Sequence, residues 1–93
     1  MEFEWDEDKR QSVLAERNLD ILDAAKIFNG FVVTHVDNRR DYGEERLVSL
    51  GLVHGEAYLV IYTQRHGVTR IITAWKAGRN GKRKYQASLS RRD

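Results

Sequence analysis

Four stretches rich in β-branched and aromatic residues occupy most of the chain between Phe31 and Lys76. The last three are joined by connections as short as HG and RHG. Strands joined in this way pair antiparallel, because a parallel pair needs a crossover of a dozen residues or more. The sequence therefore predicts a four-stranded antiparallel sheet made of FVVTHV (31–36), RLVSLGLV (46–53), EAYLVIYTQ (56–64) and VTRIITAWK (68–76).

Alternation along the third stretch divides its side chains between the two faces of the sheet. The two sets are Ala57, Leu59 and Ile61, and Tyr58, Val60 and Tyr62. We expect the first, wholly apolar set to face the helices and the second set to face a wetter surface.

Two short helices are predicted ahead of the sheet. Asp6 has the chemistry of an N-cap before EDKRQSVLAER (7–17), and Asn18 tolerates the left-handed conformation that ends many helices. Asp20 can cap a second helix, ILDAAKIFN (21–29), which carries an apolar stripe.

The chain ends are predicted to add a strand and a helix. FEW (3–5) can form a short opening strand, and AGRNGKRKYQASLSRR (77–92) can form a basic C-terminal helix. With 93 residues and neither prolines nor a low-complexity linker, the chain is expected to form one α+β domain over residues 1–93.

The charge is distributed unevenly along the chain. Residues 1–30 hold eight acids and four bases, whereas residues 63–93 hold one acid and nine bases, although the net charge is only +2. A cationic segment on a folded domain is typical of a partner that is a polyanion such as RNA. A solvated basic helix that confers only solubility is the alternative.

The composition also speaks against several classes of protein. Without cysteines the chain forms neither disulfides nor thiolate zinc sites, and its three histidines lack ligand-like spacing. No apolar run approaches the roughly 18 residues of a membrane span, and the N-terminus is acidic. We therefore expect a cytoplasmic protein with no metal, no cofactor and no contact with membranes.

Cationic and aromatic side chains are expected to converge near the ends of the last two strands. Arg65 and Arg70 are candidate phosphate clamps, because guanidinium groups bind phosphate in a forked geometry. Cleavage of RNA without a metal needs a base for the 2′-hydroxyl, cations for the dianionic phosphorane and an acid for the leaving 5′-oxygen. Tyr62, His66, Lys76 and Tyr85 are the candidates for proton transfer, and the sequence does not decide among them.

The chain resembles the BrnT toxins, the ribonuclease partners of BrnA antitoxins in bacterial type II toxin–antitoxin pairs. The resemblance rests on the order and spacing of FEWDEDK, AAKIF, DYGEERLVSLG, YTQRHG, RIITAWKA and Tyr85. It implies a RelE-like α+β fold and a metal-independent endoribonuclease that inhibits translation. It also implies a BrnA-like ribbon-helix-helix antitoxin in a 2:2 heterotetramer, which binds operator DNA through the antitoxin and represses its own operon.

On this basis we assign two groups of site residues. The catalytic group is Arg65, Arg70, Lys76 and Tyr85, and the RNA-binding group is Tyr62, His66, Trp75, Arg79, Lys82 and Arg83. We expect folding to bring the cations after residue 63 into one pocket sized for a phosphodiester.

The sequence departs from the resemblance at two positions of this segment. Trp75 stands where relatives usually have arginine, and Gly81 stands where they have glutamate. Loss of a guanidinium removes charge-assisted hydrogen bonds, so these residues predict an attenuated toxin with reduced activity. The alternative functions are a non-catalytic co-repressor that binds the antitoxin and an unrelated RNA-binding module.

Overall fold

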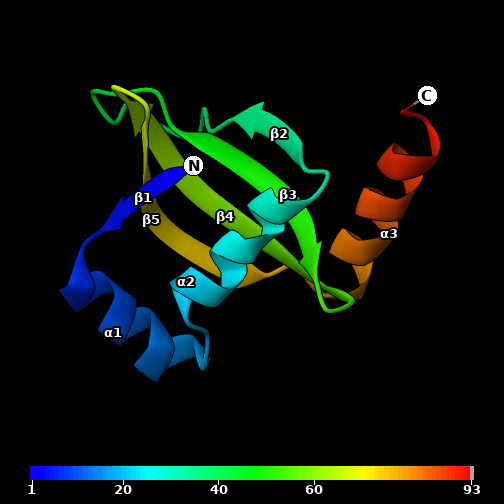
Figure 1. Cartoon of the computed structure of the whole chain (residues 1–93), viewed down its shortest axis with the longest axis horizontal. Helices are drawn as coiled ribbons and strands as arrows, with labels where there is room; N and C mark the ends of the chain where they lie inside the picture. The colour runs from blue at the N-terminus through cyan, green and yellow to red at the C-terminus, as the bar shows by residue number, and fades with distance from the viewer. Residues whose placement is uncertain (93) are drawn as a thin grey trace.

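The computed structural model describes residues 1–92 and forms a five-stranded sheet with helices on both faces (Figure 1). The strand order is β1-β5-β4-β3-β2. The elements, in chain order, are β1 (Glu2–Trp5), α1 (Glu7–Arg17), α2 (Ile21–Ala24), the 3-10 helix η1 (Ala25–Asn29), β2 (Val33–Val36), β3 (Leu47–Val53), β4 (Glu56–Arg65), β5 (Val68–Lys76) and α3 (Gly78–Ser90).

The sheet is mixed, which corrects the prediction of four antiparallel strands. Strands β2 to β5 do form the predicted antiparallel meander. The opening strand β1 then returns to the sheet and pairs in parallel with β5, from Glu2 opposite Val68 to Trp5 opposite Ile71. This pairing covers the first half of an edge strand that would otherwise expose unpaired backbone groups.

The two hairpin turns of the meander confirm the short connections. His54 and Gly55 have φ values of 49° and 80°, and His66 and Gly67 have values of 52° and 80°. Positive φ at both central residues is the conformation that matches the right-handed twist of the flanking strands. Both histidines therefore act as turn residues.

The helices α1 and α2 cover one face of the sheet. The side chains on this helix-covered face are not the set Ala57, Leu59 and Ile61 that the sequence predicted. Val60 and Tyr62 are buried beneath the two helices together with Ile71 and Ala74, so the expected wet surface is wrong for this set. Ala57, with Leu50, packs against Tyr85 of α3 on the opposite face. The error arose because alternation separates two faces but does not identify which one meets the larger apolar layer.

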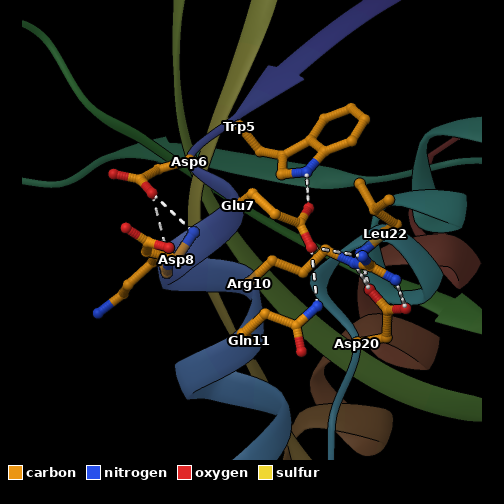
Figure 2. Close-up of polar contacts among 9 residues, drawn as sticks. Trp5, Asp6, Glu7, Asp8, Arg10, Gln11, Asp20 and Leu22 are labelled. Carbon is orange, nitrogen blue, oxygen red and sulfur yellow. Dashed lines mark hydrogen bonds and ion pairs between the residues drawn. The ribbon is translucent and has the colours of Figure 1, made fainter.

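Capping and a shared ion pair fix α1 against α2 (Figure 2). Asp6 accepts the backbone N–H groups of Asp8 and Lys9, and Asp20 accepts that of Leu22, so both predicted N-caps are confirmed. Arg10 donates to both carboxylate oxygens of Asp20, from Nε to Oδ1 at 2.9 Å and from Nη2 to Oδ2 at 2.8 Å. Asn18 ends α1 in the left-handed conformation, with φ of 52°, as predicted.

The second predicted helix is only partly α-helical. Residues 21–24 form α2, and the chain then tightens into the 3-10 helix η1. This segment packs directly on β3, where a Cβ built on Gly51 would lie 2.6 Å from the Cβ of Ile27. The absence of a side chain at Gly51 therefore lets η1 approach the sheet.

The terminal helix α3 is anchored by one buried side chain. Tyr85 is 6% exposed, its ring packs against Phe31, and its hydroxyl donates to the carbonyl oxygen of Phe31 at 2.8 Å. At the start of the helix, a Cβ on Gly81 would lie 2.3 Å from that of Ala77 and 3.7 Å from Leu50 Cδ1. Gly81 thus has a packing role in this chain.

We predict that Asp20→Asn lowers the melting temperature at pH 7 by a few degrees, because Asn still caps α2 but cannot pair with the Arg10 charge. The bond from Arg10 lowers the pKa of Asp20 from 3.8. The stabilisation is therefore complete above about pH 4 and is lost as the pH falls through the lower folded-state pKa. Melting curves should differ at pH 7 and converge in acid, once the pH lies below the lowered pKa of Asp20.

The matched control is Asp6→Asn, which removes a charge that caps α1 through backbone N–H groups. We expect a smaller effect from this control at pH 7. Equal melting temperatures for wild type and Asp20→Asn at pH 7 would contradict the role assigned to the pair.

We predict that Gly81→Ala destabilises the protein by about 1–3 kcal/mol, despite the higher helix propensity of alanine, because the rigid Ala77 Cβ must move. Urea unfolding measures the change. Gly30→Ala is the control, since a Cβ there meets nothing within 4 Å. Equal stability of the two variants would show that α3 adjusts without cost.

Candidate functional site

A cavity of about 860 Å³ lies on the sheet face opposite α1 and α2. Its floor consists of two rows of side chains that the strand register places side by side. One row is Val33, Leu50, Leu59 and Trp75, and the other is His35, Val48 and Ile61. Directly opposed side chains of antiparallel strands lie about 5 Å apart, so the floor is continuous from β2 to β5.

The polar walls of this cavity come from two other segments. Lys84 and Ser88 line it from α3, Arg91 lines it from the C-cap of that helix, and Asp37, Asn38 and Arg39 line it from the loop after β2. Lys84 and Ser88 are four positions apart, which places them on one side of the helix, and Arg91 follows three positions later. The cavity is therefore an apolar floor between a basic helix and a polar loop.

Arg39 is fixed at the cavity by a buried carboxylate. Its Nε and Nη2 donate to the two oxygens of Asp37 at 2.8 and 2.9 Å, and the Asp37 side chain is 2% exposed. These bonds lower the pKa of Asp37 to about 2, so it is ionised at neutral pH. Asp37 thus holds Arg39 in place and offsets its charge.

Trp75 closes the β5 side of the cavity beneath two guanidinium groups. Arg17, from the last turn of α1, donates through Nη1 to Thr73 Oγ1 at 2.8 Å and to the Ala74 carbonyl at 3.1 Å. Its Cζ lies 4.6 Å from the centroid of the Trp75 ring, and that of Arg39 lies 5.9 Å away. The register with β1 ends at Ile71, so Arg17 also satisfies a carbonyl of β5 beyond that pairing.

The electrostatics of the cavity favour an anion. Arg39, Lys84 and Arg91 line it against the single carboxylate of Asp37, and His35 adds an imidazole from β2. Such a set can bind phosphate through several charge-assisted hydrogen bonds and leaves an imidazole in the same cavity.

The structure does not bring the predicted catalytic residues together. Arg65 lies at the β4–β5 turn and pairs with Glu44 at 3.1 Å, and Arg70 pairs with Glu4 at 3.4 Å. Lys76 is six residues farther along β5, roughly 20 Å from Arg70. The expected single pocket for the cations after residue 63 is therefore wrong.

Tyr62 and Tyr85 are also out of reach of a surface ligand in this structure. Tyr62 is 4% exposed, and its hydroxyl shares a 2.6 Å hydrogen bond with Ser49 on the helix-covered face. The Tyr85 hydroxyl donates its hydrogen bond to the carbonyl oxygen of Phe31, as described above. Burial of both rings depends on partners far along the chain, which the sequence pattern does not report.

The remaining predicted residues fall into separate places. Trp75 lines the cavity, whereas His66 shares a shallow depression with Arg65. Arg79 and Lys82 line another depression beside the β3–β4 turn, and Arg83 is exposed on α3. The role of these residues in RNA binding stays a prediction.

The cavity residues that the sequence reasoning missed are His35, Arg39, Lys84 and Arg91, and it also missed Arg17, which contacts the Trp75 ring. The spacing of Lys84, Ser88 and Arg91 was a usable signal, because it defines one basic side of the predicted helix. Arg17 and Arg39 gave no local signal. They reach Trp75 from positions 58 and 36 residues away, which is evident only after folding.

Within residues 1–92, no three histidine, aspartate or glutamate side chains are grouped so that they could share a metal ion. None of the helices described there has the length and apolar character needed to cross a bilayer.

Fold and cavity together define a small α+β protein with a basic hollow on one face of its sheet. The family model described as "Ribonuclease toxin, BrnT, of type II toxin-antitoxin system" matches residues 5–80. The chain therefore belongs to the BrnT family, as the sequence resemblance predicted. A search of curated proteins found no match.

Proposed function

We propose that this chain is a metal-independent endoribonuclease that cleaves RNA in the cavity on the sheet and thereby inhibits translation. Membership of the BrnT family supports a ribonuclease toxin in general. The observation that carries the proposal is the arrangement of Arg39, Lys84 and Arg91 from two separate segments around one hollow. The proposed site is therefore this cavity face, in place of the group predicted from the sequence, which is Arg65, Arg70, Lys76 and Tyr85.

The residues around the cavity can supply the groups that the reaction needs. A base removes the proton from a ribose 2′-hydroxyl, the 2′-oxygen attacks phosphorus, and the bond to the 5′-oxygen breaks as that oxygen takes up a proton. Lys84 and Arg91 are placed to stabilise the dianionic phosphorane. His35 contributes an imidazole to the floor, and we assign proton transfer to it.

The partners follow from the family and from the exposed strand edge. A toxin of a type II system has an antitoxin. We propose that this antitoxin is a BrnA-like ribbon-helix-helix protein that forms a 2:2 heterotetramer and carries the complex to operator DNA. The β2 edge, where Thr34, His35 and Val36 are exposed, supports a partner that covers this side of the sheet.

A second candidate function is a non-catalytic co-repressor that only binds the antitoxin. The apolar cavity floor favours it, because Val48, Leu50 and Ile61 suit a protein segment better than a phosphate. The test below separates the two functions, since the co-repressor binds its partner without cutting RNA.

We predict that the purified protein cleaves single-stranded RNA with a chelator present, and that Lys84→Met or Arg91→Met slows cleavage by about 100-fold. Arg65→Met is the matched control, because Arg65 lies at the β4–β5 turn with its side chain 66% exposed. Initial rates on end-labelled RNA measure the effect. Slower cleavage by the Arg65 variant, with the Lys84 variant unchanged, would return the site to that turn.

We also propose that Trp75 attenuates the toxin, because it stands where the resemblance places an arginine. The neighbouring Arg17 does not replace that charge, since its guanidinium is bound to Thr73 and Ala74. Trp75→Arg is predicted to raise the cleavage rate by about 10-fold and to strengthen growth arrest, because it adds a guanidinium at the cavity. Trp75→Gln, which removes the indole without adding charge, should not. Unchanged growth arrest by Trp75→Arg would contradict attenuation.

A further inference from the structure

The aromatic ring of Trp75 lines the cavity and remains partly accessible to solvent. The residue ends the row Val33–Leu50–Leu59–Trp75 and is partly exposed, whereas Leu50 in the same row is 6% exposed. Apolar surface kept accessible inside a hollow with polar walls is typical of a ligand site. The ring is large and flat, and it lies beside cations that suit a phosphodiester.

Arg17 holds the indole in place from one side. Its guanidinium is itself fixed by bonds to the Thr73 hydroxyl and the Ala74 carbonyl, and it stacks at 4.6 Å from the ring centroid. The indole therefore has little rotamer freedom left to lose when a ligand binds. Such preorganisation favours affinity.

Arg39 covers the same indole less tightly. Its Cζ is 5.9 Å from the ring centroid, which is 1.3 Å farther than that of Arg17. Asp37 holds both Nε and Nη2 of this guanidinium, and the Arg39 side chain is 63% exposed, so most of it is open to solvent. Arg17 belongs to α1 beside β5, whereas Arg39 follows β2 at the opposite edge of the sheet. The two arginines therefore reach Trp75 from elements near opposite edges of the sheet.

We infer that Trp75 is the stacking platform for one unpaired nucleobase, which Arg39 covers from above. Unpaired RNA bases stack on aromatic rings and on guanidinium planes, and here both are present at one position. Asn38 and His35 line the same cavity and offer hydrogen-bonding groups to the edge of the base. This inference rests on the proposed function, and it adds a base-binding subsite to the phosphate-binding groups.

Stacking at Trp75 gives the enzyme a preference as well as affinity. Stacking strength rises with ring size, so a purine gains more from the platform than a pyrimidine does. The same indole that removes a charge from the cavity thus selects the nucleotide beside the scissile bond. Trp75→Arg should therefore cleave faster but with less discrimination between purine and pyrimidine at that position.

The test uses the full chain with Trp5→Phe, which leaves Trp75 as the single tryptophan. The probe is a short 2′-O-methyl oligoribonucleotide, which cannot be cleaved because its 2′-oxygens are blocked. One version carries adenine at a central position, and a second is abasic there. We expect the adenine oligonucleotide to quench Trp75 fluorescence, and the abasic one to bind through its phosphates with little quenching.

A double-mutant cycle measures the contact itself. Trp75→Leu keeps apolar bulk without the ring, and we expect it to weaken binding of the adenine oligonucleotide by about 5- to 100-fold. It should change binding of the abasic oligonucleotide by less than about 2-fold. Trp75→Phe should recover part of the loss. The converse protein, with Trp5 kept and Trp75→Phe, should show no quenching.

The inference fails if the adenine oligonucleotide binds, as measured by anisotropy, without changing Trp75 emission. It also fails if Trp75→Leu weakens both oligonucleotides equally, or if only the antitoxin changes the emission, which would make the platform a protein-docking surface. Absence of oligonucleotide binding at low salt overturns it as well. Because these probes cannot be cut, quenching without cleavage of ordinary RNA would overturn the proposed nuclease but support the base-binding site.

Discussion

Strand β4 is the element on which the rest of this structure depends. Its ten residues pair with β3 on one side and with β5 on the other, so both faces of the sheet are organised around its alternation. Val60 and Tyr62 point into the layer of α1 and α2, whereas Leu59 and Ile61 point into the cavity. A one-residue slip of β4 would exchange these sets and destroy core and cavity together.

The two faces are closed by helices in different ways. On the helix-covered face, α1 and α2 bury a continuous core and are held to each other by Arg10 and Asp20. On the cavity face, α3 covers only the end of the sheet near Leu50 and Ala57, through Tyr85. The cavity exists because the rest of this face has no helix above it.

Local chemistry in the sequence predicted most of the elements, and long-range pairing explains the errors. The caps at Asp6 and Asp20 and the end of α1 at Asn18 act within a few residues, so the sequence carries them directly. The parallel pairing of β1 with β5 joins residues about 66 positions apart, from Glu2 to Val68, and no periodicity reports it. The tightening of the second helix into η1 likewise depends on Gly51, across the sheet.

The charge pattern explains why folding does not gather the cations after residue 63 into one pocket. The basic C-terminal third is not free to act as one cationic segment, because acids from the N-terminal two thirds pair with it. Glu4 pairs with Arg70, Glu44 with Arg65 and Glu56 with Lys76. Folding thus neutralises the cations on the β4–β5 hairpin and leaves the cavity to residues contributed by other elements.

The charges that remain around the cavity determine what a side chain at position 75 can contribute. A guanidinium at this position would add to the charge of a cavity that already has Arg39, Lys84 and Arg91 around it, with Arg17 next to the ring. An indole contributes no charge, but it is stabilised by the same neighbours through cation–π contacts and stays rigid. In the proposed function, Trp75 therefore offers a flat surface to a base where an arginine would offer a charge to phosphate.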